Sequence, residues 1–343
     1  MKKLFVLFVS VLLSVSCCTV KTQSQGNVPF MTRKFTAAAV KQVEATTAGG
    51  SIILTGDAGS EAKVDVFVSR NDWSVEKIKQ VLNDNYTIDI KLEGGKLIAV
   101  AKQKSSFGNW NNQGLSISFK ISVPRQVNSN LQTSGGSIKI SGLSGSQDFK
   151  TSGGSLSVDD VSGNTRGATS GGSITVSASN DNIDLATSGG SITAKDCTGK
   201  INLATSGGSL NMSNLNGTVN AATSGGSITA SNINGTLKTG TSGGSVRLTG
   251  ISGNLDASTS GGSMEVSIAS VSDYVRLSNS GNLSLTLPSG KGYNLKVRAN
   301  KVETSGLKDF RGSMESRNID GTVGIGGAEI NVRSSQRVRL AFD

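Results

Sequence analysis

A tetrapeptide, Thr-Ser-Gly-Gly, recurs eight times at one fixed interval in the middle of this 343-residue chain. Each copy begins 18 residues after the one before it. A strict period of this size is typical of repeat proteins, in which each repeat buries its apolar side only by stacking on its neighbours. The eight copies begin at Thr133, Thr151, Thr169, Thr187, Thr205, Thr223, Thr241 and Thr259.

The apolar residues within each repeat predict its strands. Numbered from the threonine, positions 6 and 8 are apolar, position 11 is mostly apolar, and positions 15 and 17 are apolar in pairs such as Ile183 and Leu185. Alternation with period two indicates two short strands per coil, each with one buried face. Gly-Gly at positions 3–4 predicts one corner, and glycine at position 13 predicts another that needs positive φ. We therefore expect an all-β, single-stranded parallel β-solenoid (β-helix) of 18-residue coils, right-handed by analogy with crossover connections.

Stacking of identical positions explains several residue choices. Thr and Ser at positions 1, 2 and 5 are expected to form hydroxyl ladders, and Asn214, Asn216, Asn232 and Asn234 are expected to form amide ladders. Phe149 is expected to fill the space that Gly167 leaves in the next coil. Cys197 stands at position 11, so we interpret it as a small buried apolar residue.

The flanks of the array are less regular. Residues 47–52 are a degenerate copy of the same coil, and Ser74 is a candidate N-cap for one short helix. The Gly94-Gly95 pair predicts a hairpin turn. Because the ends of a stack expose unpaired strand edges, we expect atypical capping ends on both sides.

The chain begins with the features of a secretory signal. Lys2 and Lys3 precede an apolar stretch, and small residues lead to Cys17. The sequence before Cys17 resembles a lipobox, with Cys18 as the alternative site of lipidation. We thus expect an exported, outer-membrane lipoprotein, with the periplasmic and cell-surface sides both open.

These features divide the chain into five parts. We expect a signal peptide of lipoprotein type at residues 1–16, a lipidated start and tether at 17–29, and an N-terminal start and cap with a hairpin and short helix at 30–132. Regular repeats follow at 133–276, and C-terminal coils and a cap at 277–343.

The formal net charge of +10 lies on the flanks of the array. Residues 131–269 hold 7 Lys/Arg and 8 Asp/Glu, whereas residues 270–343 hold 11 and 7. Binding of single-stranded nucleic acid needs a basic groove interleaved with stacking aromatics, and aromatic residues are 4% of the chain. We therefore expect no nucleic-acid partner.

Few residues are suited to catalysis or metal binding. The chain has no histidine and 3 cysteines, so we expect no cofactor, no metal and no enzymatic activity. Carboxylates share a repeat position in only two columns, and a carbohydrate-active enzyme would have to use one of them. The columns are Asp160 with Asp196, and Asp148 with Asp184 and Asp256.

One segment has the composition of a ligand-binding loop. Residues 105–114 combine serines and amides with two aromatic rings, which can stack on a sugar and hydrogen-bond to it. The alternative is a surface loop with Trp110 packed on the body. The candidate contacts are Phe107, Asn109, Trp110 and Asn111.

The Ser-Gly-Gly-Ser-Ile type corners occur between two strands that end in proline motifs. Ile121-Ser122-Val123-Pro124 precedes the array and Leu287-Pro288-Ser289-Gly290 follows it. Over residues 30–340 this pattern resembles the bacterial putative-adhesin family of β-solenoid envelope lipoproteins, a family of unknown function common in Bacteroidetes. The resemblance implies a fold and an envelope location, and it supplies no catalytic residues.

The sequence therefore predicts a non-enzymatic cell-envelope protein, an adhesin or scaffold anchored by a lipid. Its expected ligand is a glycan or an envelope protein. Two alternatives stay open: a carbohydrate-active enzyme, and a periplasmic accessory or sensor protein that acts through a protein partner.

Overall fold

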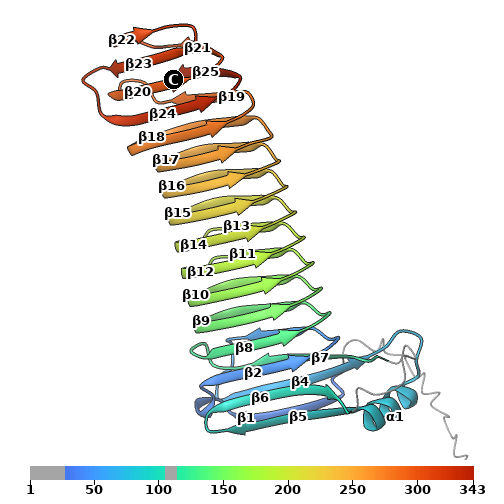
Figure 1. The fold of residues 1–343 in the computed structure, drawn as a ribbon. Helices are drawn as coiled ribbons and strands as arrows, with labels where there is room; N and C mark the ends of the chain where they lie inside the picture. Colours follow the sequence, from blue (N-terminus) through green and yellow to red (C-terminus); the bar gives the residue numbers. More distant parts are fainter. Residues whose placement is uncertain (1–27, 105–113) are drawn as a thin grey trace, which may run out of the picture.

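The protein forms a long stack of parallel strands with an irregular cap at each end (Figure 1). The computed structural model describes residues 28–104 and 114–343. Strands make up 67% of the structure and helices 5%. Each 18-residue repeat is one turn of the stack, which we call a rung.

The strands and helices follow one another along the chain in three groups. The N-terminal group is β1 (Met31–Thr36), the 3-10 helix η1 (Ala37–Ala39), β2 (Gln42–Thr47), β3 (Ile52–Thr55), β4 (Glu61–Ser69), α1 (Val75–Asn85), β5 (Tyr86–Glu93), β6 (Lys96–Gln103), β7 (Ser116–Ser122) and β8 (Asn128–Thr133). The central group is β9 (Ile138–Thr151), β10 (Leu156–Thr169), β11 (Ile174–Ser177), β12 (Asn180–Thr187), β13 (Ile192–Lys195), β14 (Thr198–Thr205), β15 (Leu210–Thr223), β16 (Ile228–Thr241), β17 (Val246–Thr259) and β18 (Met264–Asn279). The C-terminal group is β19 (Leu283–Leu287), β20 (Tyr293–Arg298), β21 (Lys301–Ser305), β22 (Phe310–Met314), β23 (Asn318–Val323), β24 (Ala328–Ser334) and β25 (Arg337–Phe342).

Each rung contributes to two walls of the stack. The first wall holds positions 6–9, as in β11, and the second wall holds positions 12–18 with the next threonine, as in β12. Neighbouring rungs pair in parallel with residue i opposite residue i+18, for example Leu156 opposite Ile174 and Asn164 opposite Asn182. Outward side chains at one position therefore form a column along the stack.

The prediction of a single-stranded parallel β-solenoid with two short strands per coil is wrong. The hydrogen-bonded pairs close a barrel of six parallel strands, in the order β10, β11, β13, β15, β14 and β12, and many further strands are bonded outside it. Five rungs hold one continuous strand of 14 residues instead of two short ones: β9, β10, β15, β16 and β17.

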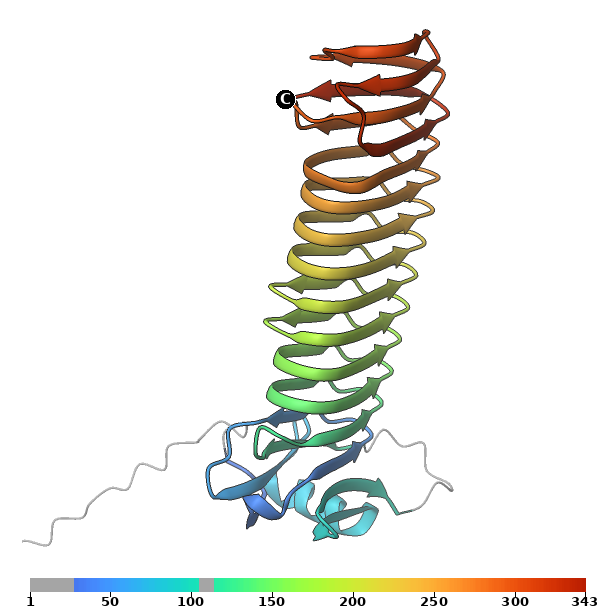
Figure 2. The same cartoon turned by 90° about the vertical axis from the view of Figure 1, so that its left-hand side faces the viewer.

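The barrel closes because two rungs are interrupted between their walls (Figure 2). In the first of them, position 11 is Ser179, and its Oγ accepts the N–H of Val161 at 3.2 Å. Position 11 of the second is Cys197, which is buried. Cys197 Sγ contacts the carbonyl of Lys195 at 3.2 Å. At these positions the two rungs are divided into β11 with β12 and β13 with β14, while the continuous β10 and β15 join the walls on either side.

The core lies inside the rungs, at the apolar positions that the sequence indicates. Ile192, Ala194, Ile201 and Leu203 of one rung are each at most 2% exposed. The expected match of Phe149 and Gly167 is confirmed, since a Cβ on Gly167 would meet the Phe149 ring at 2.4 Å. Burial in the core raises the pKa of the Cys197 thiol, which suits an apolar packing role for this residue.

The threonine of each repeat ties its rung to the preceding one. Thr205 Oγ1 donates to the carbonyl of Gly190 in the rung before it at 2.8 Å, and accepts from the N–H of Gly208 in its own rung at 3.2 Å. All eight threonines make the first bond, at 2.7–2.8 Å, and are 4–6% exposed. The expected threonine hydroxyl ladder is thus wrong, because each hydroxyl bonds to glycine backbone.

The two glycines of the corner have different roles. A Cβ on Gly190, at position 4, would lie 2.1 Å from the carbonyl oxygen of Gly172, so only glycine allows this approach. A Cβ on Gly189, at position 3, would lie 3.5 Å from its nearest neighbours, which is ordinary contact. The position 4 glycine is therefore required by packing between rungs.

We predict that Gly190→Ala lowers the free energy of unfolding by about 1–3 kcal/mol or more, because the methyl group overpacks a backbone contact. Gly189→Ala, one residue away, is the matched control and should change stability by less than about 1 kcal/mol. Thermal and denaturant unfolding of both variants would measure the difference. Equal destabilisation by the two would contradict the assignment.

At both ends the order of coils in space differs from their order in the chain. The strands β2 and β3 lie between β6 with β7 on one side and β8 with β9 on the other. Similarly β24 and β25 lie between β18 with β19 and β20 with β21. The first and last coils are therefore paired on both sides, which protects them from fraying.

The caps contain the antiparallel pairs of the fold. The hairpin of β5 and β6 turns at Gly94-Gly95, as the sequence predicts. Ser74 Oγ accepts from Lys77 N at the start of α1, as expected for its N-cap. The antiparallel strands β1, β22 and β23 also lie outside the stacked rungs.

Deleting residues 337–343 should unfold the C-terminal cap. The deletion removes β25 from between β19 and β21, and it removes the buried side chains of Val338 and Leu340. Loss of these two side chains alone corresponds to at least about 3 kcal/mol. We expect the deletion variant to be cleaved rapidly within β20–β23. Limited proteolysis with mass spectrometry of the fragments would locate the cleavage sites. Unchanged protease resistance would contradict the stabilising role of β25 between β19 and β21.

Candidate binding groove

The candidate ligand contacts and lipidation sites lie outside the described residues. Residues 1–27 include Cys17 and Cys18, and residues 105–113 include Phe107, Asn109, Trp110 and Asn111. These assignments stay predictions.

The first carboxylate column, Asp160 with Asp196, stands at a corner of the rungs. Both residues are at position 10 and have positive φ, 51° and 54°. The same position is Asn214 and Asn232 in the next rungs, each with φ of 54°. Asparagine, aspartate and glycine adopt this left-handed conformation most readily, so the column is explained by backbone geometry.

Both carboxylates of this column are engaged by neighbouring side chains. Arg125 donates two hydrogen bonds to Asp160, at 2.7 and 2.9 Å, and the hydrogen-bonded guanidinium lowers the pKa of that carboxyl. Asp196 Oδ1 accepts from Asn214 Nδ2 at 2.8 Å, and Asn214 Oδ1 accepts from Asn232 Nδ2 at 3.1 Å. The amide ladder expected between Asn214 and Asn232 is therefore confirmed.

The second carboxylate column faces outward at position 16 of the second wall. Asp184 lies 3.7 Å from Arg166 Nε in the rung before it. Asp148 and Asp256 are separated from Asp184 by rungs that carry Arg166 on one side, and Asn202, Asn220 and Lys238 on the other. The structure thus does not bring the acids of this column together.

We predict that Asp196→Asn leaves stability within about 0.5 kcal/mol of the original, because asparagine occupies the same corner in the next two rungs. Asp196→Val should lower the free energy of unfolding by about 1–2 kcal/mol, since a β-branched residue tolerates positive φ poorly. Denaturant unfolding of the pair measures the effect. A large loss in Asp196→Asn would show that the carboxylate itself matters.

In the described ranges no group of three or more His, Cys, Asp or Glu side chains could hold a metal ion. Nor does any described helix have the length and apolar character needed to cross a membrane.

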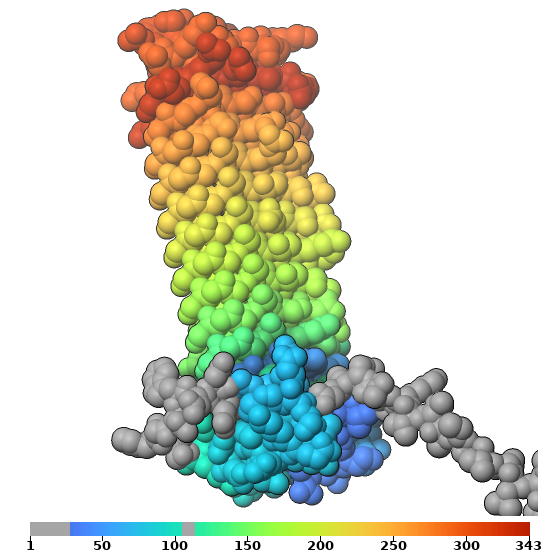
Figure 3. Space-filling view, turned by 90° about the vertical axis from the view of Figure 1, so that its right-hand side faces the viewer, coloured from blue at the N-terminus to red at the C-terminus, as the bar shows by residue number. Residues whose placement is uncertain are grey.

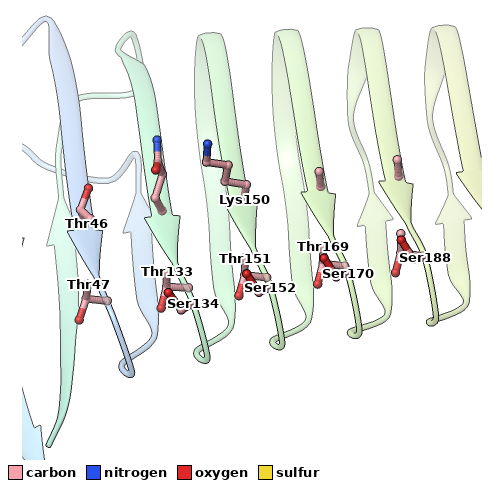
Figure 4. A pocket seen from close by; sticks show the side chains of 14 residues that line it. Thr46, Thr47, Thr133, Ser134, Lys150, Thr151, Ser152, Thr169, Ser170 and Ser188 are labelled. Atoms are coloured by element: carbon pink, nitrogen blue, oxygen red, sulfur yellow. The ribbon is translucent and has the colours of Figure 1, made fainter. Parts of the chain in front are cut away.

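A shallow groove runs along the second wall, where position 18 is small in six successive rungs. Two depressions lie along this wall, with volumes of about 560 and 470 Å³, the first beside positions 1 and 2 and the second beside position 16. The first reaches from Thr46 to Ser188, and Figure 4 shows its rows of threonine and serine side chains with Lys150 beside them. The small residues of the groove are Ala168, Ala186, Ala204, Ala222, Gly240 and Ser258.

Polar side chains line each of the two depressions. Serines at position 2, such as Ser170 and Ser188, line the first. Position 16 lines the second, where Asn220 Nδ2 donates to Asn202 Oδ1 at 3.0 Å. Hydroxyl and amide groups in register every rung, about 4.8 Å apart, suit a long ligand that offers hydrogen-bonding groups at intervals.

This groove was not predicted from the sequence, although its signal was present there. Alanine recurs at position 18 from Ala168 to Ala222, next to the buried position 17. The regular rows of side chains along the stack are visible in the space-filling view (Figure 3). The parallel pairing of the rungs, with residue i opposite residue i+18, shows that these small residues lie side by side on the outward face.

The fold and the groove together define an elongated β-repeat protein with a shallow groove along one wall. No family model matches the chain, and no curated protein matches it.

Solved structures resemble it at low identity. One is a putative cell adhesion protein from Clostridium sporogenes, at 11% identity over 91% of this chain and 98% of that chain, with a TM-score of 0.19. Another is a putative adhesin from Bacteroides fragilis, at 15% identity over 74% and 95%, with a TM-score of 0.31. A third is a putative lipid binding protein from Parabacteroides distasonis, at 14% identity over 93% and 98%, with a TM-score of 0.28. Similarity at this level carries no argument about function.

Proposed function

We propose that the protein is a non-enzymatic adhesin or scaffold of the cell envelope, tethered by a lipid on Cys17 or Cys18, that binds an extended ligand along the groove. The observation that carries the proposal is the groove itself: its two depressions span successive rungs, with hydroxyl groups in register along the first and amide groups in register along the second. A linear glycan offers hydroxyl groups at matching intervals and can contact the small residues between them.

Rigidity of the surface supports this proposal. The corner bonds of each threonine and the close glycine contacts hold every rung in one register. A binding surface that is already ordered avoids the loss of conformational entropy on association. Eight rungs extend over roughly 38 Å, a length that favours an extended ligand over a small molecule.

The carbohydrate-active enzyme remains the main alternative. Its candidate carboxylates have structural partners: Asp160 is bound by Arg125, Asp196 by Asn214, and Asp184 lies beside Arg166. An accessory or sensor role through a protein partner is the second alternative, and it would use the same exposed walls.

Larger side chains on the floor of the groove should block binding. We expect Ala186→Gln with Ala204→Gln to weaken binding of a linear polysaccharide at least about tenfold, because the new side chains occupy the depressions. Thr175→Gln with Thr193→Gln is the matched control, since both threonines face outward on the first wall of neighbouring rungs.

Affinity electrophoresis of the full chain against neutral and acidic linear polysaccharides measures this effect. Equal weakening by the two double variants, or no polysaccharide binding at all, would contradict the proposed ligand site. Hydrolysis or lyase turnover of a bound polysaccharide would favour the enzymatic alternative.

A further inference from the structure

The outward face of the second wall changes character at its C-terminal end. Position 18 passes from Ser258 to Ser278 in β18, then to Arg333 in β24 and Arg298 in β20. Lys296 stands two residues before Arg298, on the same face of β20. We call Lys296, Arg298 and Arg333 the basic patch.

All three side chains of the basic patch are exposed. Arg298 and Arg333 stand directly opposite each other in the parallel pair of β20 and β24, about 4.8 Å apart along the stack. Their other register neighbours, Asn318 and Ser278, are uncharged. Like charges that face each other across strands destabilise a sheet, so this pair opposes folding.

Nearby carboxylates do not neutralise the two arginines. Asp320 stands opposite Lys296 in register, and Asp256 stands opposite Arg276. The Arg276 guanidinium also lies over the Tyr274 ring, at 4.3 Å. Across the described ranges, the ion pairs within 4.0 Å involve neither Arg298 nor Arg333.

The arginines of the first wall at the same level are arranged differently. Arg337 and Arg339 of β25 lie 3.6 and 3.5 Å from Glu303, and Lys301 lies 2.8 Å from it. The Lys301 hydrogen bond, with the two guanidinium groups, lowers the pKa of the Glu303 carboxyl. On the first wall the Glu303 carboxylate therefore pairs with the two arginines. On the second wall no described carboxylate forms an ion pair with Arg298 or Arg333.

We infer that the basic patch binds the carboxylate groups of a linear glycan that continues along the groove. Arginine pairs bind carboxylate or sulfate oxygens through charge-assisted, bidentate hydrogen bonds. Because position 18 is one continuous column, a polymer along the groove reaches Arg333 and Arg298 directly after Ser278. This inference rests on the proposed function and specifies its ligand as an acidic polysaccharide.

The chemistry of this face favours an acidic glycan over a nucleic acid. A single-stranded nucleic acid needs a series of aromatic rings on which bases stack. Tyr274 is the one aromatic side chain on the outward face of β18, β20 and β24, and Arg276 already lies over it. Hydroxyl and amide borders suit sugar hydroxyl groups instead.

The test compares two charge-matched double variants of the full chain. Arg298→Gln with Arg333→Gln should weaken binding of polygalacturonate oligosaccharides at least about tenfold, with no loss of thermal stability because both side chains are exposed and repel each other. Arg337→Gln with Arg339→Gln removes the same charge from the first wall and should change binding less than about threefold. Binding by the unaltered protein should weaken as salt concentration rises.

The outcomes separate this inference from the proposed function. Equal weakening by both double variants, or none by either, would overturn the assignment of the basic patch. Binding of neutral xylan but not polygalacturonate, with sensitivity to Ala186→Gln and Ala204→Gln, would overturn the acidic ligand while the proposed function stood. Binding of single-stranded DNA in preference to polygalacturonate would also overturn it.

Discussion

The structure depends on the contact between glycine backbones at one corner of each rung. A threonine hydroxyl donates to the carbonyl of the position 4 glycine in the preceding rung, and that carbonyl lies where any Cβ of the next position 4 residue would fall. This contact fixes the distance and the register between neighbouring rungs. Hydrophobic burial is not directional, so the core alone does not set the register. Because the contact repeats in every regular rung, outward side chains at one position form straight columns along the stack.

Straight columns are what make the surface suited to an extended ligand. The six small residues at position 18 form a groove only because each rung repeats the orientation of the last. The same register brings Arg298 and Arg333 together at the C-terminal end of the groove, although they lie 35 positions apart in the chain. Binding groups and their spacing therefore both derive from the construction of the rungs.

Much of the local structure could be predicted from the sequence. The buried positions, the Phe149 and Gly167 match, the Ser74 N-cap and the Gly94-Gly95 turn all depend on neighbours in sequence or on one repeat interval. The expected solenoid of two-strand coils was wrong because five rungs continue as one strand through position 11, whereas the rung of Ser179, whose Oγ accepts the N–H of Val161, is divided there. The role of Asp160 and Asp196 was also missed, because positive φ at position 10 is a property of the folded corner.

The sequence by itself determined the 18-residue period, the all-β character and the residues that face the core, since a repeated pattern of apolar side chains must be buried in the same way in every repeat. Only the tertiary structure decided the order of the terminal coils. There β2 with β3, and β24 with β25, enter between coils that are distant from them in the chain. Such pairings depend on hydrogen bonds between segments whose separation follows no period, so the basic patch became visible only in three dimensions.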